Sequence, residues 1–141
     1  MDASITLAGN VGTDVEFNSG EGWAFARFRL ATTPRFRRNG EWVDGETTWV
    51  NVSISGRSAE NVRASVAKGD PLIVVGRLRT HTWDSEGVKH DRLVVEATAV
   101  GHDLSRGTTL FTRPERPRPE VIEEDEHQID EREPELASSL G

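Results

Sequence analysis

Three features are missing from this sequence of 141 residues, and each absence narrows the range of functions. It contains no cysteine, which excludes disulfide bonds, thiolate nucleophiles and cysteine–zinc sites. It has no apolar run near the roughly 20 residues that a membrane-spanning helix needs. Its first residues have neither a basic start nor an apolar stretch, so we expect no secretory signal. These absences favour a cytoplasmic protein with no membrane partner.

The net charge of −7 at neutral pH comes from one end of the chain. Residues 1–113 hold 14 lysines and arginines against 14 aspartates and glutamates, so this part is neutral. Residues 114–141 hold 3 basic and 10 acidic residues. The net charge of the whole chain therefore does not describe residues 1–113, and the charge of each segment has to be considered separately.

A change in composition at residue 114 predicts a domain boundary. Residues 114–120 contain three prolines, each of which lacks a backbone donor and fixes φ. The remaining residues, 121–141, have few apolar side chains and much like charge, so burial cannot offset the entropy lost on ordering. We expect one folded domain over residues 1–113 and a disordered acidic tail over residues 114–141.

The first part of the chain has mostly the pattern of β-strands. Alternating apolar and polar side chains, interrupted by turn residues, predict five strands. Residues 37–41, with a turn pair at their centre, indicate a hairpin loop, and residues 85–87 a further turn. Gly9 and Gly12 are expected in turns, and Gly76 within a strand predicts a bulge or a barrel corner. The strands are expected over residues 4–11, 23–30, 48–54, 72–83 and 92–100.

One helix interrupts the strand pattern. Ser58 is placed to cap its start, and Ala59, Val62 and Val66 form an apolar stripe. Gly69 stands where a left-handed residue ends a helix. Three strands, one short helix and two further strands are the element order of an OB-fold, a five-stranded Greek-key barrel. We therefore expect a mainly β protein with this fold.

Alternation within the strands separates an interior from an exterior face. One face is apolar, as with Ala24, Ala26 and Phe28 in the second strand. The other face carries large aromatic rings among basic side chains. These outward-facing residues are Phe25, Arg27, Arg29, Trp49, Arg77, Arg79, His81 and Trp83.

Aromatic rings interleaved with arginines on an exposed sheet suit a single strand of nucleic acid. Every base can stack on an aromatic ring, which is worth about 1–3 kcal/mol per base, and arginine neutralises phosphates. A duplex hides its base faces, so the pattern favours an unpaired strand. The competing reading for any tryptophan is a place in the core or in a subunit interface. For Trp23 and Trp42, at a strand start and in a loop, both readings stay open.

With these residues placed, the chain resembles the bacterial single-stranded DNA-binding protein family over residues 3–104. The matching stretches are ITLAGNVGTD (5–14), FRLATT (28–33), TW (48–49), GRSAE (56–60), KG (68–69) and GRLRTHTW (76–83). Each is short, but their order and spacing make the match specific. The resemblance implies an OB-fold, usually a homotetramer, that wraps single-stranded DNA without sequence preference in replication, repair or recombination. We expect no cofactor and no metal site.

The aromatic DNA-stacking positions of the family fall on Trp49 and Trp83, which strand alternation also selects. A third falls on Phe36, a smaller ring, and a fourth on Ser55, which has no ring. Losing one ring and shrinking another predicts weaker binding than in a typical member.

Basic positions of the family fall on Arg57, Lys68 and Arg79. Arg35 and Arg37 flank Phe36 in an arginine-rich loop. The expected DNA-binding residues are therefore Arg27, Arg29, Arg35, Phe36, Arg37, Trp49, Arg57, Lys68, Arg77, Arg79 and Trp83.

The tail departs from the family pattern. The family usually has a glycine-rich linker and an acidic tip ending in an apolar pair, which recruits replication and repair enzymes. Here the linker is missing, the acidic run is internal and the sequence closes on LASSLG (136–141), so recruitment through the usual tip is not expected. These departures are typical of a divergent or accessory paralogue. The anionic tail either competes with DNA for the arginines or only aids solubility, and both alternatives stay open.

Other classes of function compete with DNA binding. The four histidines show no metal-ligand spacing and the paired acids of the tail lie in a segment that cannot hold catalytic geometry, so we expect no enzyme. A protein-interaction module on an OB scaffold would bury Trp49 and Trp83. An RNA binder of the cold-shock type uses the same stacking, and only the family resemblance selects DNA. As a DNA binder, the protein is expected to be nucleoid-associated.

Overall fold

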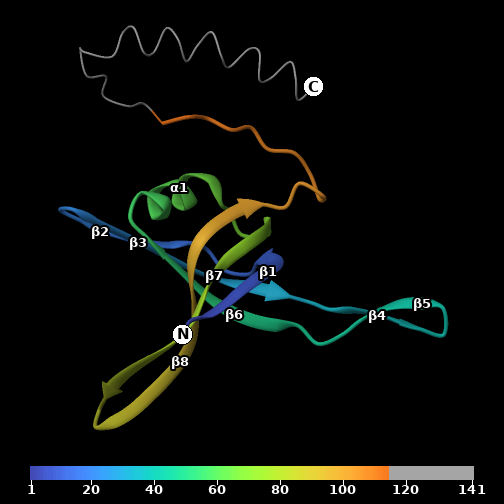
Figure 1. Ribbon diagram of the computed structural model, residues 1–141, viewed down its shortest axis with the longest axis horizontal. Coiled ribbons are helices and arrows are strands. Elements are labelled where there is room, and N and C mark those ends of the chain that lie inside the picture. Colours follow the sequence, from blue (N-terminus) through green and yellow to red (C-terminus); the bar gives the residue numbers. More distant parts are fainter. Residues whose placement is uncertain (115–141) are drawn as a thin grey trace, which may run out of the picture. The chain divides into compact units, whose positions relative to one another are not determined.

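The computed structural model describes residues 1–114, and Met1–Thr109 form one compact unit (Figure 1). The expected disordered tail lies outside the described residues except for Pro114, and the boundary between residues 113 and 114 stays a prediction. The elements of the described part are β1 (Ala3–Val11), β2 (Glu16–Gly20), β3 (Trp23–Thr32), β4 (Arg35–Arg38), β5 (Glu41–Asp44), β6 (Thr48–Ser55), α1 (Arg57–Ser65), β7 (Pro71–Ser85) and β8 (Val88–His102).

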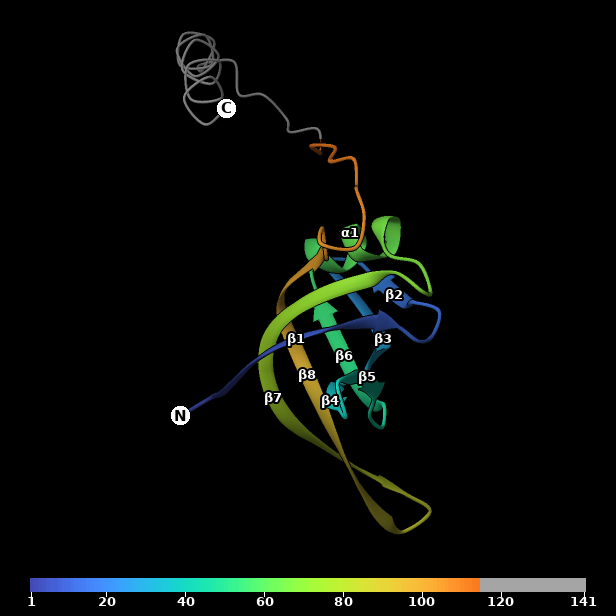
Figure 2. The ribbon, with the colours of Figure 1, turned by 90° about the vertical axis from the view of Figure 1, so that its right-hand side faces the viewer.

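Six strands form one curved sheet in the order β1-β7-β8-β6-β3-β2. Its neighbours pair antiparallel, except for the parallel pair β6–β8. A short additional pairing joins β1 to β3 through Asn10 with Ala31 and Val11 with Leu30, so the sheet turns back on itself. Figure 2 shows the strands wrapping around a common interior, with α1 at one end. The five predicted strands correspond to β1, β3, β6, β7 and β8 of this partly open barrel, β2 is an addition, and the predicted OB-fold is confirmed.

The core lies inside this curved sheet and confirms the predicted alternation. In β3, Ala26, Phe28 and Leu30 are buried, and the arginines between them are exposed. The helix adds Ala59 and Val62 to the same cluster. Burying one such aliphatic or aromatic side chain contributes about 1.5–3 kcal/mol, so this interior holds the outer face of the sheet in place. The largest fully buried side chains are Leu30, Val52, Leu72, Val74 and Val95.

The start of α1 differs from the prediction, because Ser58 is not the cap. The helix begins at Arg57, its N-cap is Gly56, and no side chain makes a capping hydrogen bond. Gly56 has φ 77°, a left-handed conformation in which its carbonyl accepts a hydrogen bond from the Ala59 amide at 3.0 Å. At the other end the helix stops at Ser65, and Gly69 with φ 96° belongs to the following turn instead.

Of two glycines predicted to lie in turns, Gly9 lies inside a strand instead, and Gly12 lies in the connection between β1 and β2; both allow close packing. Gly9 is inside β1, where a Cβ would overlap the carbonyl oxygen of Ala31 on β3. Gly12 follows β1, and a Cβ there would overlap the ring of Trp49. The predicted irregularity at Gly76 is confirmed, since the pairing of β7 with β8 shifts register between Val75 and Gly76.

The predicted turns are confirmed, but the strands beside them are longer. Asn39 and Gly40 have φ values of 54° and 81°, and Glu86 and Gly87 have 51° and 77°. Both pairs have the two positive φ values of a type I′ hairpin turn. Around the first turn the predicted loop is itself the β4–β5 hairpin, and after the second β8 begins at Val88 rather than at residue 92.

Candidate nucleic-acid interface

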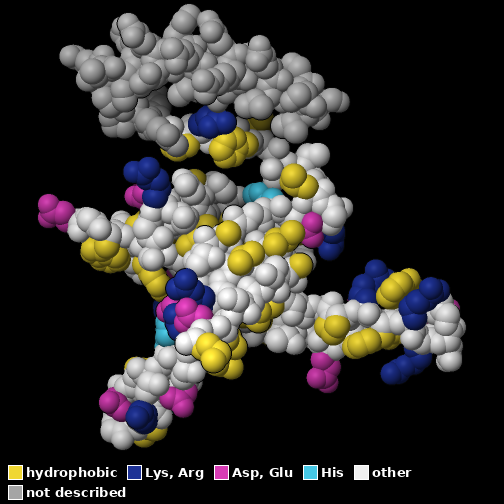
Figure 3. All heavy atoms as spheres, in the orientation of Figure 1, with side chains coloured by type: hydrophobic (Ala, Val, Ile, Leu, Met, Phe, Trp, Pro, Cys, Tyr) yellow, Lys and Arg dark blue, Asp and Glu magenta, His cyan; other side chains and the backbone are white. Residues whose placement is uncertain are grey.

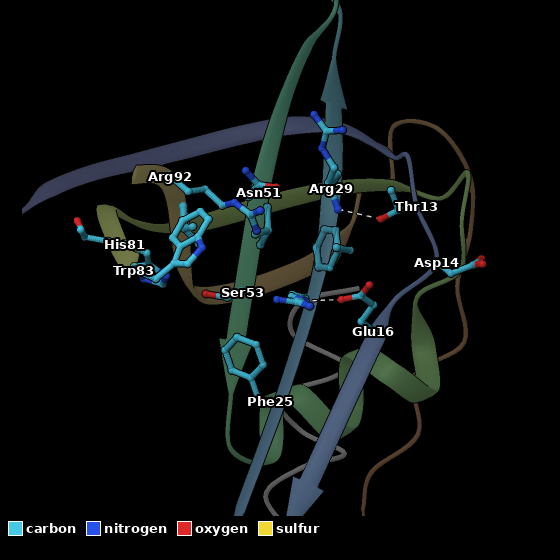
Figure 4. Close-up of a pocket in the computed structure, with 15 residues that line it drawn as sticks. Thr13, Asp14, Glu16, Phe25, Arg29, Asn51, Ser53, His81, Trp83 and Arg92 are labelled. Atoms are coloured by element: carbon cyan, nitrogen blue, oxygen red, sulfur yellow. Dashed lines mark hydrogen bonds and ion pairs between the residues drawn. The ribbon is translucent and has the colours of Figure 1, made fainter. Parts of the chain in front are cut away.

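A groove with a volume of about 850 Å³ crosses the outer face of the sheet (Figure 4). Its lining comes from β3, β6, β7 and β8, together with β2 and the connection that precedes it. Phe28, Val52 and Val94 provide buried apolar lining. Polar and basic side chains surround them, so the groove offers both apolar surface and hydrogen-bonding groups. The other lining residues are Thr13, Asp14, Glu16, Phe25, Arg27, Arg29, Asn51, Ser53, His81, Thr82, Trp83 and Arg92.

Trp83 lies on one side of this groove, close to the turn at Glu86 and Gly87 that joins β7 to β8. Its indole is stacked on His90 of β8, with ring centroids 5.3 Å apart and planes inclined by 20°. The Arg92 guanidinium lies 5.3 Å from the indole centroid. Trp83 is still 42% exposed, so the ring is held in place and remains accessible to a base.

Trp49 lies on β6 close to the groove, although it does not line it. The Arg29 guanidinium, which does line the groove, is 5.0 Å from the Trp49 ring centroid. The backbone amide of Arg29 donates a hydrogen bond to Thr13 Oγ1 at 3.0 Å. Trp49 is 48% exposed and packs against Gly12. Each of the two predicted indoles therefore lies at the surface with an arginine beside it.

Three of the four predicted arginines on β3 and β7 pair with carboxylates of residues 1–114, Arg29 being the exception. Arg27 forms an ion pair with Glu16 across β2 and β3. Arg77 and Arg79 contact Asp2 at 3.5 and 2.7 Å. These ion pairs hold the arginines in place. A DNA phosphate would have to displace the carboxylates, and this displacement costs part of the binding energy.

Glu96 on β8 links Arg79 to His81, which lines the groove. It accepts hydrogen bonds from His81 at 3.1 Å and from Arg79 at 3.4 Å. The hydrogen bond from His81 is the main cause that lowers the pKa of the Glu96 carboxyl, and Arg79 lowers it further. Glu96 is therefore a carboxylate at neutral pH, and it offsets part of the positive charge on this side of the sheet.

The predicted residues Arg35, Phe36 and Arg37 all lie on β4, in the separate β4–β5 hairpin, away from the groove lining. Phe36 pairs with Val43, while Arg37 pairs with Trp42. Neighbouring positions on a strand point to opposite faces, so the arginines and Phe36 do not share one face. The hairpin therefore presents Trp42, not Phe36, beside the predicted arginines.

Arg57 and Lys68 lie at the helix, outside the groove lining. Arg57 is the first residue of α1, and Lys68 is in the turn between α1 and β7. Both are exposed. The structure does not bring them together with the two indoles, so a DNA path would reach them only by extending beyond the groove.

Of the groove residues, only Arg27, Arg29 and Trp83 belong to the predicted set, and three of the others extend its aromatic, basic and amide groups. Phe25 pairs with Ser55 across β3 and β6, so a ring stands next to the position where the sequence lacks one. Arg92 pairs with His81 across the β7–β8 hairpin, and Asn51 pairs with Arg29. Pairing β7 with β8 outward from the turn at residues 86–87 would have placed Arg92 opposite His81, on the outer face of the sheet.

Comparisons with known proteins agree with this geometry. Residues 2–103 match the model of the "Single-strand binding protein family". The chain is 44% identical over 112 residues to single-stranded DNA-binding protein 2 of Streptomyces avermitilis, covering 78% of this chain and 71% of the relative. It is 38% identical over 128 residues to single-stranded DNA-binding protein 1 of Streptomyces coelicolor, covering 84% and 82%.

Solved structures show the same fold. The crystal structure of the small single-stranded DNA-binding protein from Streptomyces coelicolor matches with a TM-score of 0.68 and 37% identity, covering 76% of this chain and 99% of that one. The second single-stranded DNA-binding protein of Mycobacterium smegmatis matches with a TM-score of 0.64 and 31% identity, covering 80% and 100%. Fold, exposed rings and family match coincide over the same residues, and the chain belongs to the single-strand binding protein family.

Proposed function

We propose that the protein binds single-stranded DNA without sequence preference and performs no chemistry of its own. The observation that carries this proposal is the pair of exposed indoles, Trp49 and Trp83, each with a guanidinium about 5 Å from its ring centroid. The indoles lie along the outer face of one curved sheet, with the groove beside them. Bases stack on such rings whatever their identity, and the arginines attract the phosphates between them.

Family membership adds the setting for this activity. Proteins of the family bind single-stranded DNA, are typically tetrameric and are not enzymes. We infer a homotetramer that protects unpaired DNA in the cytoplasm, at the nucleoid, during replication, repair or recombination. The matches to relatives numbered 1 and 2 in Streptomyces fit an accessory paralogue. No helix within residues 1–114 is long and apolar enough to cross a membrane.

A titration with three ligands of equal length tests the proposal. Oligo-dT, oligo-U and duplex DNA are added to the full chain, and the intrinsic tryptophan fluorescence is followed. We expect oligo-dT to quench the emission and to bind more tightly than the duplex, because the duplex hides its base faces. Tighter binding of oligo-U would favour the RNA-binding alternative, and no binding of any ligand would favour a protein-interaction module.

A further inference from the structure

The β4–β5 hairpin forms its own two-stranded sheet and projects from the barrel (Figure 1). In Figure 3 dark-blue basic side chains and yellow hydrophobic side chains gather on this arm. Its strands run over Arg35–Arg38 and Glu41–Asp44, and all eight of their residues are exposed. An isolated two-stranded hairpin is only marginally stable in water. Because all eight residues are exposed, the aromatic side chains of this hairpin do not form a core that would account for their presence.

Pairing divides the side chains of the hairpin between two faces. Directly paired residues share a face, and positions two apart on one strand do so as well. Trp42 therefore lies on the face of its partner Arg37 and of Arg35. Phe36 lies on the opposite face with its partner Val43.

Trp42 is an exposed ring held between positive charges. It is 57% exposed, and the guanidinium carbons of Arg35 and Arg37 both lie 5.4 Å from its ring centroid. Arg37 donates a hydrogen bond to the Gly40 carbonyl at 3.3 Å, and Arg35 lies 3.6 Å from Asp44. These contacts order the two cations beside the indole while leaving more than half of Trp42 open to solvent.

Phe36 is placed differently. Its ring lies against Gly45 at the base of the hairpin, where a Cβ would overlap it. The Gly45 amide in turn donates a hydrogen bond to the Pro34 carbonyl at 2.7 Å, which closes the base of the arm. Phe36 therefore packs on the junction between the hairpin and the barrel. Its direct partner is Val43, and Arg38, the basic residue on its face, pairs with Glu41.

We propose that Trp42 is a further base-stacking residue, and that Arg35 and Arg37 contact the phosphates on either side of the stacked base. The proposal rests on the proposed function, and it adds to it a second contact region that carries the DNA beyond the groove onto the hairpin. A single strand of DNA suits the face of the hairpin that carries Trp42, because its exposed ring can stack on a base and its two cations can contact the flanking phosphates. The aromatic that stacks on this arm is then Trp42, and Phe36 has a structural role.

Affinity measurements on variants of the full chain test this assignment with long oligo-dT. Trp42→Val removes the ring but keeps a side chain that favours strands, and Trp42→Phe keeps a ring. We expect Trp42→Val to weaken binding about five- to 150-fold, the equivalent of losing one stacked base. Trp42→Phe should restore most of the affinity. Phe36→Val, on the opposite face of the same hairpin, is the matched control and should cost less than Trp42→Val.

A single-tryptophan variant gives a second readout. In W23F/W49F/W83F only Trp42 emits, and saturating oligo-dT should quench this emission. Wild-type affinity of Trp42→Val, or a larger loss in Phe36→Val than in Trp42→Val, would overturn the proposal. If Trp42→Val binds as wild type while Trp49→Ala and Trp83→Ala lose affinity, only the hairpin assignment fails. If the wild type does not bind oligo-dT, the proposed function fails and this inference fails with it.

Discussion

The indole of Trp49 packs against Gly12, and the Arg29 guanidinium lies 5.0 Å from its ring centroid. Such a cation–π contact at an exposed site is worth about 0.5–1 kcal/mol, enough to favour one orientation of the ring. The same arginine lines the groove, so one side chain both orders the ring and supplies positive charge for a phosphate. Gly12 matters here because it has no Cβ, rather than because it makes a turn.

We expect Gly12→Ala to weaken binding of single-stranded DNA. The added Cβ would overlap the Trp49 ring, so the indole must turn away and the loss should approach that of removing it, about 1–3 kcal/mol. Fluorescence titration with oligo-dT measures the change. Gly101→Ala on β8 is the control, because a Cβ there meets nothing within 4 Å. Equal affinities of the two variants would show that Gly12 does not position Trp49.

Among the elements, the turn between α1 and β7 is held by one carboxylate. Asp70 Oδ2 accepts hydrogen bonds from the Ala67 amide at 2.9 Å and from His102 Nε2 at 3.0 Å. The Val11 amide donates to the Asp70 carbonyl at 2.9 Å. The residue thus ties together the ends of β1, α1 and β8. The Ala67 amide is the main cause that lowers the pKa of the Asp70 carboxyl, and His102 adds to it.

We expect Asp70→Asn to lower the free energy of unfolding at neutral pH by about 1 kcal/mol. Because the pKa of Asp70 is lowered in the folded state, its carboxylate stabilises the fold fully at pH values above the unfolded-state pKa of about 3.9. This stabilisation is lost as the pH falls through the lower folded-state pKa. Urea unfolding at a series of pH values should therefore show a flatter acid decline in Asp70→Asn. Asp84→Asn, an exposed change on β7, is the control, and parallel acid profiles of wild type and Asp70→Asn would contradict this account.

The elements also show what could be predicted from the sequence. Strand alternation placed Trp49 and Trp83 outward because it depends only on neighbouring residues. The β2 strand and the arms of the β4–β5 hairpin were missed, since short polar or charged stretches carry no alternating apolar signal. The cap at Ser58 was wrong because the positive φ of Gly56 arises from how β6 joins α1, which local propensity does not show.

On the scale of the whole molecule, the groove depends on the order of the strands in the sheet, because β3, β6, β8 and β7 lie side by side although they are not consecutive in the chain. This order places Phe25 of β3, Trp83 of β7 and Arg92 of β8 around one groove. The ion pairs of Arg77 and Arg79 with Asp2 join residues more than 70 positions apart, so strand alternation could not predict them. The family resemblance also predicts a DNA-stacking ring at Phe36, and this stays a prediction. A family position does not show which face of a hairpin a side chain takes, so it could not indicate that Trp42 shares a face with Arg35 and Arg37.

The acidic segment over residues 114–141 is expected to affect how the full chain binds DNA. We propose that its anionic charge competes with DNA for the arginines, so that a protein ending at residue 113 binds oligo-dT more tightly. The gain should be largest at low salt, where charges are least screened, and binding of both proteins should weaken as salt rises. Equal affinities of the two proteins at every salt concentration would assign the segment a solubilising role only.

The central claim is that Trp49 and Trp83 stack with the bases of an unpaired strand. The most direct test is an oligo-dT titration of the wild type, Trp49→Ala, Trp83→Ala and the double variant, with folding checked by circular dichroism. We predict that each single change weakens binding by about 1–3 kcal/mol and that the double change weakens it further. A folded double variant that binds oligo-dT with wild-type affinity would contradict the claim.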